Sequence, residues 1–309
     1  MSHKFLLYKN NYLYLVTMTA SGPLNHADSM LHFEQAVAAA ARLDATVIGL
    51  AGSVSDALVI RHVLLAFGGA QETARGMIVS DSGAFGTGTE SGLLKALDNA
   101  ELGGLLPDRV RAAIAEIDIR GGGMWDAAEA AGHIAAASPT GMESHRAAAL
   151  VAALLLLRAG LVSAPFLSVW QLDASTRSAA VQIDRSQSWD AWMRGWFSLL
   201  AREAADALQS VIATIERFDR EHVATRAQTR VGATDASVLS WLHDNLRFTI
   251  RDASEGLRLT VPTVGTAISR LEAAGVATEL SGQRRDRVWV STALLELIET
   301  RWLGTLHSH

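Results

Sequence analysis

The stretch Leu257–Val290 constrains the fold of this chain more than any other. Apolar residues recur in it at helical spacing: Val264, Ile268 and Leu271. This spacing predicts an amphipathic helix over Thr263–Ala274 with that apolar side buried. Pro262 stands at the start, where a missing backbone N–H is tolerated, and Thr260 or the first threonine of the helix can cap it. Gly275 follows in the position that favours a left-handed residue.

A β-ribbon with a basic tip is predicted directly after this helix. Val276–Leu280 and Val288–Val290 are strand-like, and Ser281–Asp286 between them is typical of a turn. The tip contains three arginines: Arg284, Arg285 and Arg287. A helix pair followed by such a ribbon is a winged helix-turn-helix, so we expect a DNA-binding domain at 232–292.

The exposed side of the second helix of this domain has short polar and basic side chains, which contact base edges and phosphates. The candidates are Thr263, Thr266, Ser269 and Arg270, together with Arg284, Arg285 and Arg287 as phosphate or minor-groove contacts. Acidic residues dilute the positive charge: Glu272, Glu279 and Asp286. A helix-turn-helix that only packs against protein is therefore the alternative interpretation.

Composition limits the classes of protein to consider. The chain has 309 residues, which predicts two or three domains, and its apolar fraction of 49% against 19% charged residues favours large helical cores. A net charge of −5 argues against a general nucleic-acid coat and favours a site-specific binder with a local contact face. The absence of cysteine excludes disulfides and thiol catalysis, and the scattered histidines predict no metal or cofactor.

No targeting or membrane segment is predicted. The N-terminus lacks a cleavable signal pattern, and the longest apolar run, Ala147–Leu157, is shorter than the ~20 residues that span a bilayer. We therefore expect a cytoplasmic protein with no membrane partner. The preference for arginine over lysine is typical of a high-GC bacterial genome.

The rest of the chain predicts a helical domain at 25–220. Helices are expected over Asn25–Leu50, Ser55–Phe67, Ser91–Ala100, Pro107–Ile117, Met124–Ala137, Ser144–Ala159 and Trp189–Phe218. The first should bury Leu31, Phe33, Ala36, Val37, Ala40 and Leu43, and the last should bury Trp192 and Trp196. Residues 1–24 read as an irregular extension, in which Tyr12–Thr17 could start a strand or a helix. Residues 221–231 read as a charged linker and 293–309 as a helix and tail, and the glycines of 74–92 fit no phosphate-binding motif.

Several segments, taken together, resemble a known family. In order they are LLLLRAG (154–160), LVSAPFLSV (161–169), WDAWMRGWF (189–197) and the C-terminal stretch 261–290. They are similar to the second half of Fic-domain (Fic/Doc-related) proteins with a C-terminal winged helix. They resemble still more a Fic-related family common in rhizobia, which has segments like ARLDATV (41–47) and GMIVSDSGAFGTGTESG (76–92). The resemblance extends over 155–291 and, less closely, over 36–100.

Fic enzymes transfer a nucleotide monophosphate to a protein hydroxyl with the motif HPFxxGNGRxxR. Its His is the general base, an acid holds Mg²⁺, and the Gly-Asn-Gly backbone cradles phosphates. The resemblance places this motif at Ser138–Ala149, SPTGMESHRAAA, where only Pro139 and Arg146 match. A serine replaces the base and Met142 the acid, and neither can do that chemistry. The resemblance thus implies no catalytic residue and a vestigial nucleotide site: Ser138, Glu143, Ser144, His145 and Arg146.

The sequence as a whole predicts a mainly α protein that acts as a DNA-binding transcriptional regulator. Its Fic-like domain would be catalytically inert and serve for dimerisation or for sensing a small-molecule or protein effector. A homodimer on double-stranded DNA is expected because one winged helix covers only a short site. The alternative is a Fic-type nucleotidyltransferase (protein AMPylation) that uses Glu143 and His145 as substitutes, and a third possibility is a scaffold that contacts only proteins.

Overall fold

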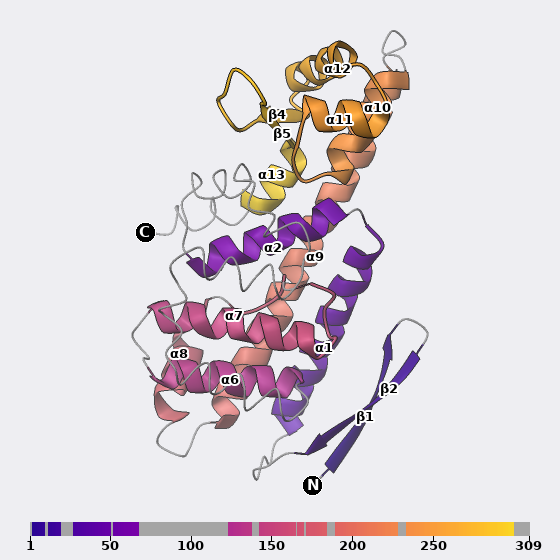
Figure 1. The fold of residues 1–309 in the computed structure, drawn as a ribbon. Helices are drawn as coiled ribbons and strands as arrows, with labels where there is room; N and C mark the ends of the chain where they lie inside the picture. The colour runs from indigo at the N-terminus through magenta and orange to yellow at the C-terminus, as the bar shows by residue number, and fades with distance from the viewer. Residues whose placement is uncertain are drawn as a thin grey trace.

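The structure, a computed structural model, describes residues 2–9, 12–19, 27–50, 52–67, 123–137, 142–164, 166–169, 171–183, 189–227 and 233–299. These residues are mainly α-helical, as predicted, with ten helices and five strands (Figure 1). The first helices are α1 (Ala27–Ile48), α2 (Gly52–Phe67), α6 (Met124–Ala137), α7 (Met142–Arg158), α8 (Ala174–Ile183) and α9 (Trp189–Ala227). The C-terminal elements are α10 (Ala233–Asp244), β3 (Phe248–Thr249), α11 (Ile250–Leu257), α12 (Val261–Ala273), β4 (Ala277–Glu279), β5 (Val288–Ser291) and α13 (Thr292–Glu299).

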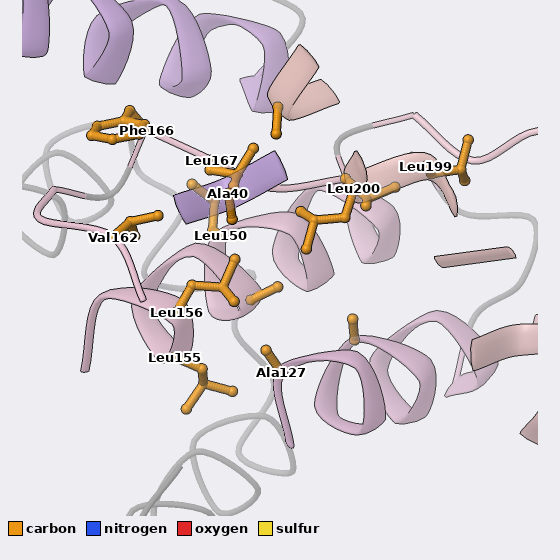
Figure 2. Close-up of a cluster of buried hydrophobic side chains, with 14 of the residues drawn as sticks. Ala40, Ala127, Leu150, Leu155, Leu156, Val162, Phe166, Leu167, Leu199 and Leu200 are labelled. Atoms are coloured by element: carbon orange, nitrogen blue, oxygen red, sulfur yellow. The ribbon is translucent and has the colours of Figure 1, made fainter. Parts of the chain in front are cut away.

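The main core lies among α1, α6, α7 and α9. The helix α7 is apolar on nearly every side and therefore has to be enclosed, and its residues from Ala148 to Leu156 are all buried. Figure 2 shows the side chains that surround it, among them Ala127 of α6, Ala40 of α1 and Leu200 of α9. The helix α9 packs along α1 and contacts α6 and α8 as well, so this 39-residue helix organises the body.

Two tryptophans of α9 are core residues, as the sequence predicted. Trp192 is 0% and Trp196 is 1% exposed. The indole Nε1 of Trp192 donates a hydrogen bond of 2.8 Å to the carbonyl oxygen of Ala128, which satisfies its only polar atom. Gly132 has no side chain, so α6 approaches the indole of Trp192 closely. Neither tryptophan is available as a stacking platform for bases.

The N-terminal prediction was wrong in part. Instead of an irregular extension, the structure has an antiparallel hairpin of β1 (Ser2–Lys9) and β2 (Tyr12–Thr19), in a register that pairs Ser2 with Thr19 and Lys9 with Tyr12. A sequence signal for it exists, because runs rich in Tyr, Leu, Val and Thr flank an Asn-Asn dipeptide at 10–11. Apolar and polar residues do not alternate strictly in these runs, which makes the strand pattern weak.

Two details of the predicted helices also differ. Leu31 is 52% exposed although it is predicted for the core side of α1, whereas Phe33 is buried. Residues two apart on a helix point to nearly opposite sides, so both could not face the core. The helix α9 continues to Ala227, so 221–227 of the predicted linker is helical, and 228–231 lies outside the described residues. The helices predicted over 91–100 and 107–117 and the glycine-rich 74–92 also lie outside them.

The last helix that the structure describes, α13, returns to the helical body. Val290 of β5 and the apolar side of α13 belong to the main core, and α13 packs on α2 and α9. A smaller core, built from α10, α11, α12, β3, β4 and Trp289, lies next to it. The domain boundary predicted at 292 therefore falls between β5 and α13, and both elements join the C-terminal unit to the main core.

A substitution at Gly132 tests the packing between α6 and α9. A Cβ at this position would lie 2.7 Å from Nε1 of Trp192 and 2.9 Å from Cζ3 of Trp189. We expect Gly132→Ala to lower the free energy of unfolding by about 1–3 kcal/mol, because overpacking outweighs the better helix propensity of alanine. Chemical denaturation measures this change.

The matched control for this substitution is Gly265→Ala in α12. A Cβ there would meet only Cδ1 of Ile250, at 3.8 Å. This variant should be neutral or gain up to about 1 kcal/mol. Equal effects of the two substitutions would contradict the close approach at Gly132.

His62 of α2 predicts a loss of stability in acid. It is buried, and burial lowers its pKa from 6.5 to about 4. Below pH 6.5 the unfolded chain therefore binds a proton at His62 that the native protein does not bind. Proton binding to the unfolded state lowers the free energy of unfolding, so stability is highest above pH 6.5 and falls as the pH falls towards 4. We expect His62→Gln to flatten the decline of the unfolding free energy over this interval, a decline of up to about 3 kcal/mol from this group.

Asp56 of the same helix gives a control of opposite sign. Burial raises the pKa of its carboxyl from 3.8 to about 6. The native state thus holds a proton that the unfolded chain releases above pH 3.8, which destabilises the fold as pH rises to 6. Asp56→Asn should therefore make the unfolding free energy fall more steeply in acid. If His62→Gln leaves the pH profile unchanged, the buried histidine is not the cause of the decline.

Candidate nucleic-acid interface

The C-terminal unit contains three helices and a three-stranded sheet. The sheet order is β3-β5-β4, with Trp289 of the central strand opposite Phe248 on one side and Glu279 on the other. The helix α10 packs on α12, and α11 packs on both. Val238, Leu239, Val264 and Ile268 are 0% exposed and form the centre of its core. The buried apolar stripe that the sequence predicted for the helix at 263–274 is confirmed in α12.

Local capping explains why α11 and α12 are separate helices. Thr249 and Asp252 form a reciprocal capping box at the start of α11. Arg258 ends that helix in the left-handed region, with φ of 55°. Thr260 then caps α12, which starts at Val261, two residues before the predicted start, because the proline at 262 is accommodated within the first turn. Gly275, at φ of 72°, follows the helix as predicted.

The outer side of α12 has small hydroxyl side chains. Thr266 and Ser269 are exposed, and their hydroxyls donate to the carbonyls of Pro262 (2.9 Å) and Gly265 (3.0 Å). Their oxygens keep acceptor capacity towards solvent. Thr263 is half-buried, and its hydroxyl lies 2.7 Å from that of the capping threonine. Of the three hydroxyl residues predicted for this surface, two face solvent directly and one helps to cap the helix.

Arg270 lies on the flank of α12 that faces α10. Its Nη1 donates to both carboxylate oxygens of Asp235, at 2.8 and 3.0 Å. The aspartate is 3% exposed in its side chain, whereas that of Arg270 is 52% exposed. The arginine therefore neutralises a buried carboxylate while its other donors remain accessible. The sequence did not predict Asp235 as the partner of Arg270, because an acidic residue in the first turn of a helix is already favoured by the helix dipole.

The loop between β4 and β5 has three exposed arginines: Arg284, Arg285 and Arg287. Its base is fixed by Glu279, whose Oε1 accepts from the backbone N–H groups of Ser281 (2.8 Å) and Gly282 (2.9 Å). Asp286 adopts a positive φ of 52°, and Nε of Arg287 donates to the carbonyl of Gln283. The structure thus brings the predicted arginines together on one braced loop.

A polar cluster connects this unit to the body. The ring of His243 in α10 stacks on Phe218 of α9, with 3.8 Å between centroids. Its Nε2 lies 2.8 Å from Glu221 and its Nδ1 lies 3.2 Å from Nε2 of His222. Burial, followed by the charges of His243 and Arg226, lowers the pKa of His222. Nothing in the sequence pairs these residues, because they come from different helices.

Arg217 extends the same cluster to α13. Its Nε donates to Glu221 at 2.9 Å, and its Nη1 pairs with Glu296. Burial acts to lower the pKa of Arg217, but hydrogen bonds to these two acids outweigh it and raise that pKa. The guanidinium therefore stays charged and joins α9 to α13, the helix that follows the C-terminal unit.

The residues predicted for a vestigial nucleotide site lie partly within the described residues. Glu143, Ser144, His145 and Arg146 lie in the first turns of α7, and His145 is the one of them whose side chain is described, as half-buried. Ser138 lies outside the described residues. Within the described part of the chain, no group of three His, Asp or Glu side chains is placed to hold a metal ion.

Comparisons with known protein families and with curated proteins found no match to this chain. Among the helices that the structure describes, none is both long and apolar enough to cross a bilayer.

The Arg270–Asp235 pair predicts a structural cost for removing the arginine. Arg270→Ala leaves a buried carboxylate without its cation, so we expect the unfolding free energy to fall by about 1–3 kcal/mol. Arg284→Ala removes the same charge from an exposed loop and should change it by less than about 0.5 kcal/mol. Urea denaturation of both variants measures the difference, and equal changes would show that the pair does not stabilise α12 against α10.

Proposed function

We propose that the protein is a DNA-binding transcriptional regulator and that 233–291 forms a winged helix-turn-helix. The order of elements supports this proposal: three helices, a short strand between the first two, and a hairpin after the third. In such domains the last helix of the three enters the major groove and the hairpin contacts the backbone or the minor groove. The helix α12 takes the first role and the β4–β5 loop the second.

The shape and position of the exposed surface carry this proposal. The helix α12 and the β4–β5 loop lie at the same end of the molecule, away from α6 and α8 (Figure 1). The outer side of α12 has only small side chains at Pro262, Thr266, Ser269 and Ala273, which share a helix face. A helix face without bulk can approach base edges closely, and threonine contacts both hydrogen-bonding groups and the thymine methyl.

The arginines supply the electrostatic part of the proposed contact. Arg284 and Arg285 are exposed on the braced loop, within reach of phosphates or the minor groove. Arg270 is held at one nitrogen by Asp235, so its remaining donors contact a phosphate or a base at the edge of the groove. This divides the surface into a base-reading helix face and a phosphate-binding loop.

The helical body completes the proposal. Two copies of a short-site domain reach useful specificity on a palindromic operator, so the body serves for dimerisation. Its Fic-like region is proposed to be catalytically inert, because serine and methionine stand where the base and the magnesium-binding acid are required.

The proposal predicts the result of a DNA titration. Purified protein is titrated against fragments of its own upstream DNA at several salt concentrations, with random competitor DNA. Arg284→Gln together with Arg285→Gln should weaken binding to all sequences and lower the slope of log K against log salt by about 0.9 for each phosphate that is no longer neutralised. Thr266→Ala should instead change the base preference, by about 1–3 kcal/mol at the position that the threonine reads.

The matched control is Arg177→Gln together with Arg202→Gln, which removes two exposed arginines from α8 and α9 of the helical body and so changes the net charge as the loop variant does. It should leave both affinity and salt slope unchanged. Equal weakening in the control and the loop variants would mean that only net charge matters. If the wild type binds its upstream DNA no more tightly than random DNA, the proposed function is rejected. Calorimetry with a nucleotide and Mg²⁺ would then test the transferase alternative.

A further inference from the structure

A cavity of about 630 Å³ lies where the C-terminal unit meets α9. One wall is the last third of α9, with Arg217, Arg220 and Glu221. The opposite wall is the end of α12 and the turn after it, with Arg270 and Gly275. Its size is within the range of small-molecule sites in proteins.

The charges of the cavity are not balanced. Asp235 is neutralised by Arg270, and Glu221 is engaged by Arg217 and His243. Arg220 is exposed and has no acidic partner within the part of the chain that the structure describes. Both acids of the lining are thus already paired, and one guanidinium remains to receive an anion from outside.

The remaining lining indicates what else a ligand would carry. Ala224, Leu271, Ala274 and Val276 give the cavity an apolar side next to its arginines. Guanidinium groups bind phosphates and carboxylates through parallel N–H donors. A small organic acid or phosphate ester with a short carbon skeleton fits this combination, whereas a cation or a neutral apolar molecule does not.

We propose that this junction cavity is a binding site for a small anionic metabolite, a phosphate or carboxylate compound, held by Arg220 of α9 and the free donors of Arg270 of α12. The ligand would contact the helix proposed to read DNA and the helix that anchors it to the body. Binding would therefore occupy donors of Arg270 that the proposed DNA contact also uses, while the pair with Asp235 stays intact. The effect on DNA affinity rests on the proposed function, but the binding itself does not.

The experiment uses the full chain and calorimetric titration in the absence of DNA. Two probes distinguish the sources of the anion: pyrophosphate for the phosphate class and citrate for the carboxylate class. We expect saturable binding of at least one probe with one site per chain, at least tenfold weaker in Arg220→Gln. The control variant Arg226→Gln removes an arginine from the same helix outside the cavity and should bind as the wild type does.

The outcomes separate this inference from the proposed function. If neither probe binds saturably, the site does not exist. If Arg220→Gln and Arg226→Gln weaken binding equally, the effect reflects net charge alone, and the site is overturned as well. Where the wild type also binds its upstream DNA, the bound probe should change that affinity in the wild type and not in Arg220→Gln. Probe binding without any DNA binding would keep the site and reject the regulator.

Discussion

The continuity of α9 is the constraint on which the rest of the structure depends. Its first half buries Trp192 and Trp196 in the main core, and its second half provides Phe218 and Glu221 at the junction. A helix keeps a fixed rise and rotation per residue, so the position of the body determines the position of the junction residues. The return of α13 to the same core closes the connection from the other end of the C-terminal unit.

The C-terminal unit consequently has little freedom to reorient. A winged helix attached through one flexible linker would move freely, but here the unit contacts a long helix on one side and is joined to the body by the strand-to-helix step from β5 to α13 on the other. Arg217, which reaches both Glu221 and Glu296, crosses between these two attachments. Under the proposed function, small shifts at the junction would be the route by which the body influences α12.

Periodicity and capping made much of the fold predictable. The stripe of Val264, Ile268 and Leu271 and the left-handed position of Gly275 follow from local rules that hold in any context. The partnership of Arg270 with its buried aspartate was not predictable, because 35 residues separate them and each has an ordinary local role. The cluster around the stacked histidine of α10 is equally non-local. Sequence reasoning thus predicted the buried side of α12 and missed the non-local interactions around it.

The charge of the C-terminal unit decides what kind of binding it can support. Residues 233–291 contain no lysine, and their seven acidic residues balance their seven arginines. Under the proposed function, long-range attraction to DNA would be weak, and affinity would have to come from short-range contacts at defined positions. An arginine tied to a buried carboxylate and a loop braced by Glu279 are pre-organised for such contacts, since little side-chain freedom remains to be removed on binding. In the proposed complex, exposed acids nearby would repel phosphates wherever the arginines do not meet them, and this repulsion would favour a defined site over random sequence.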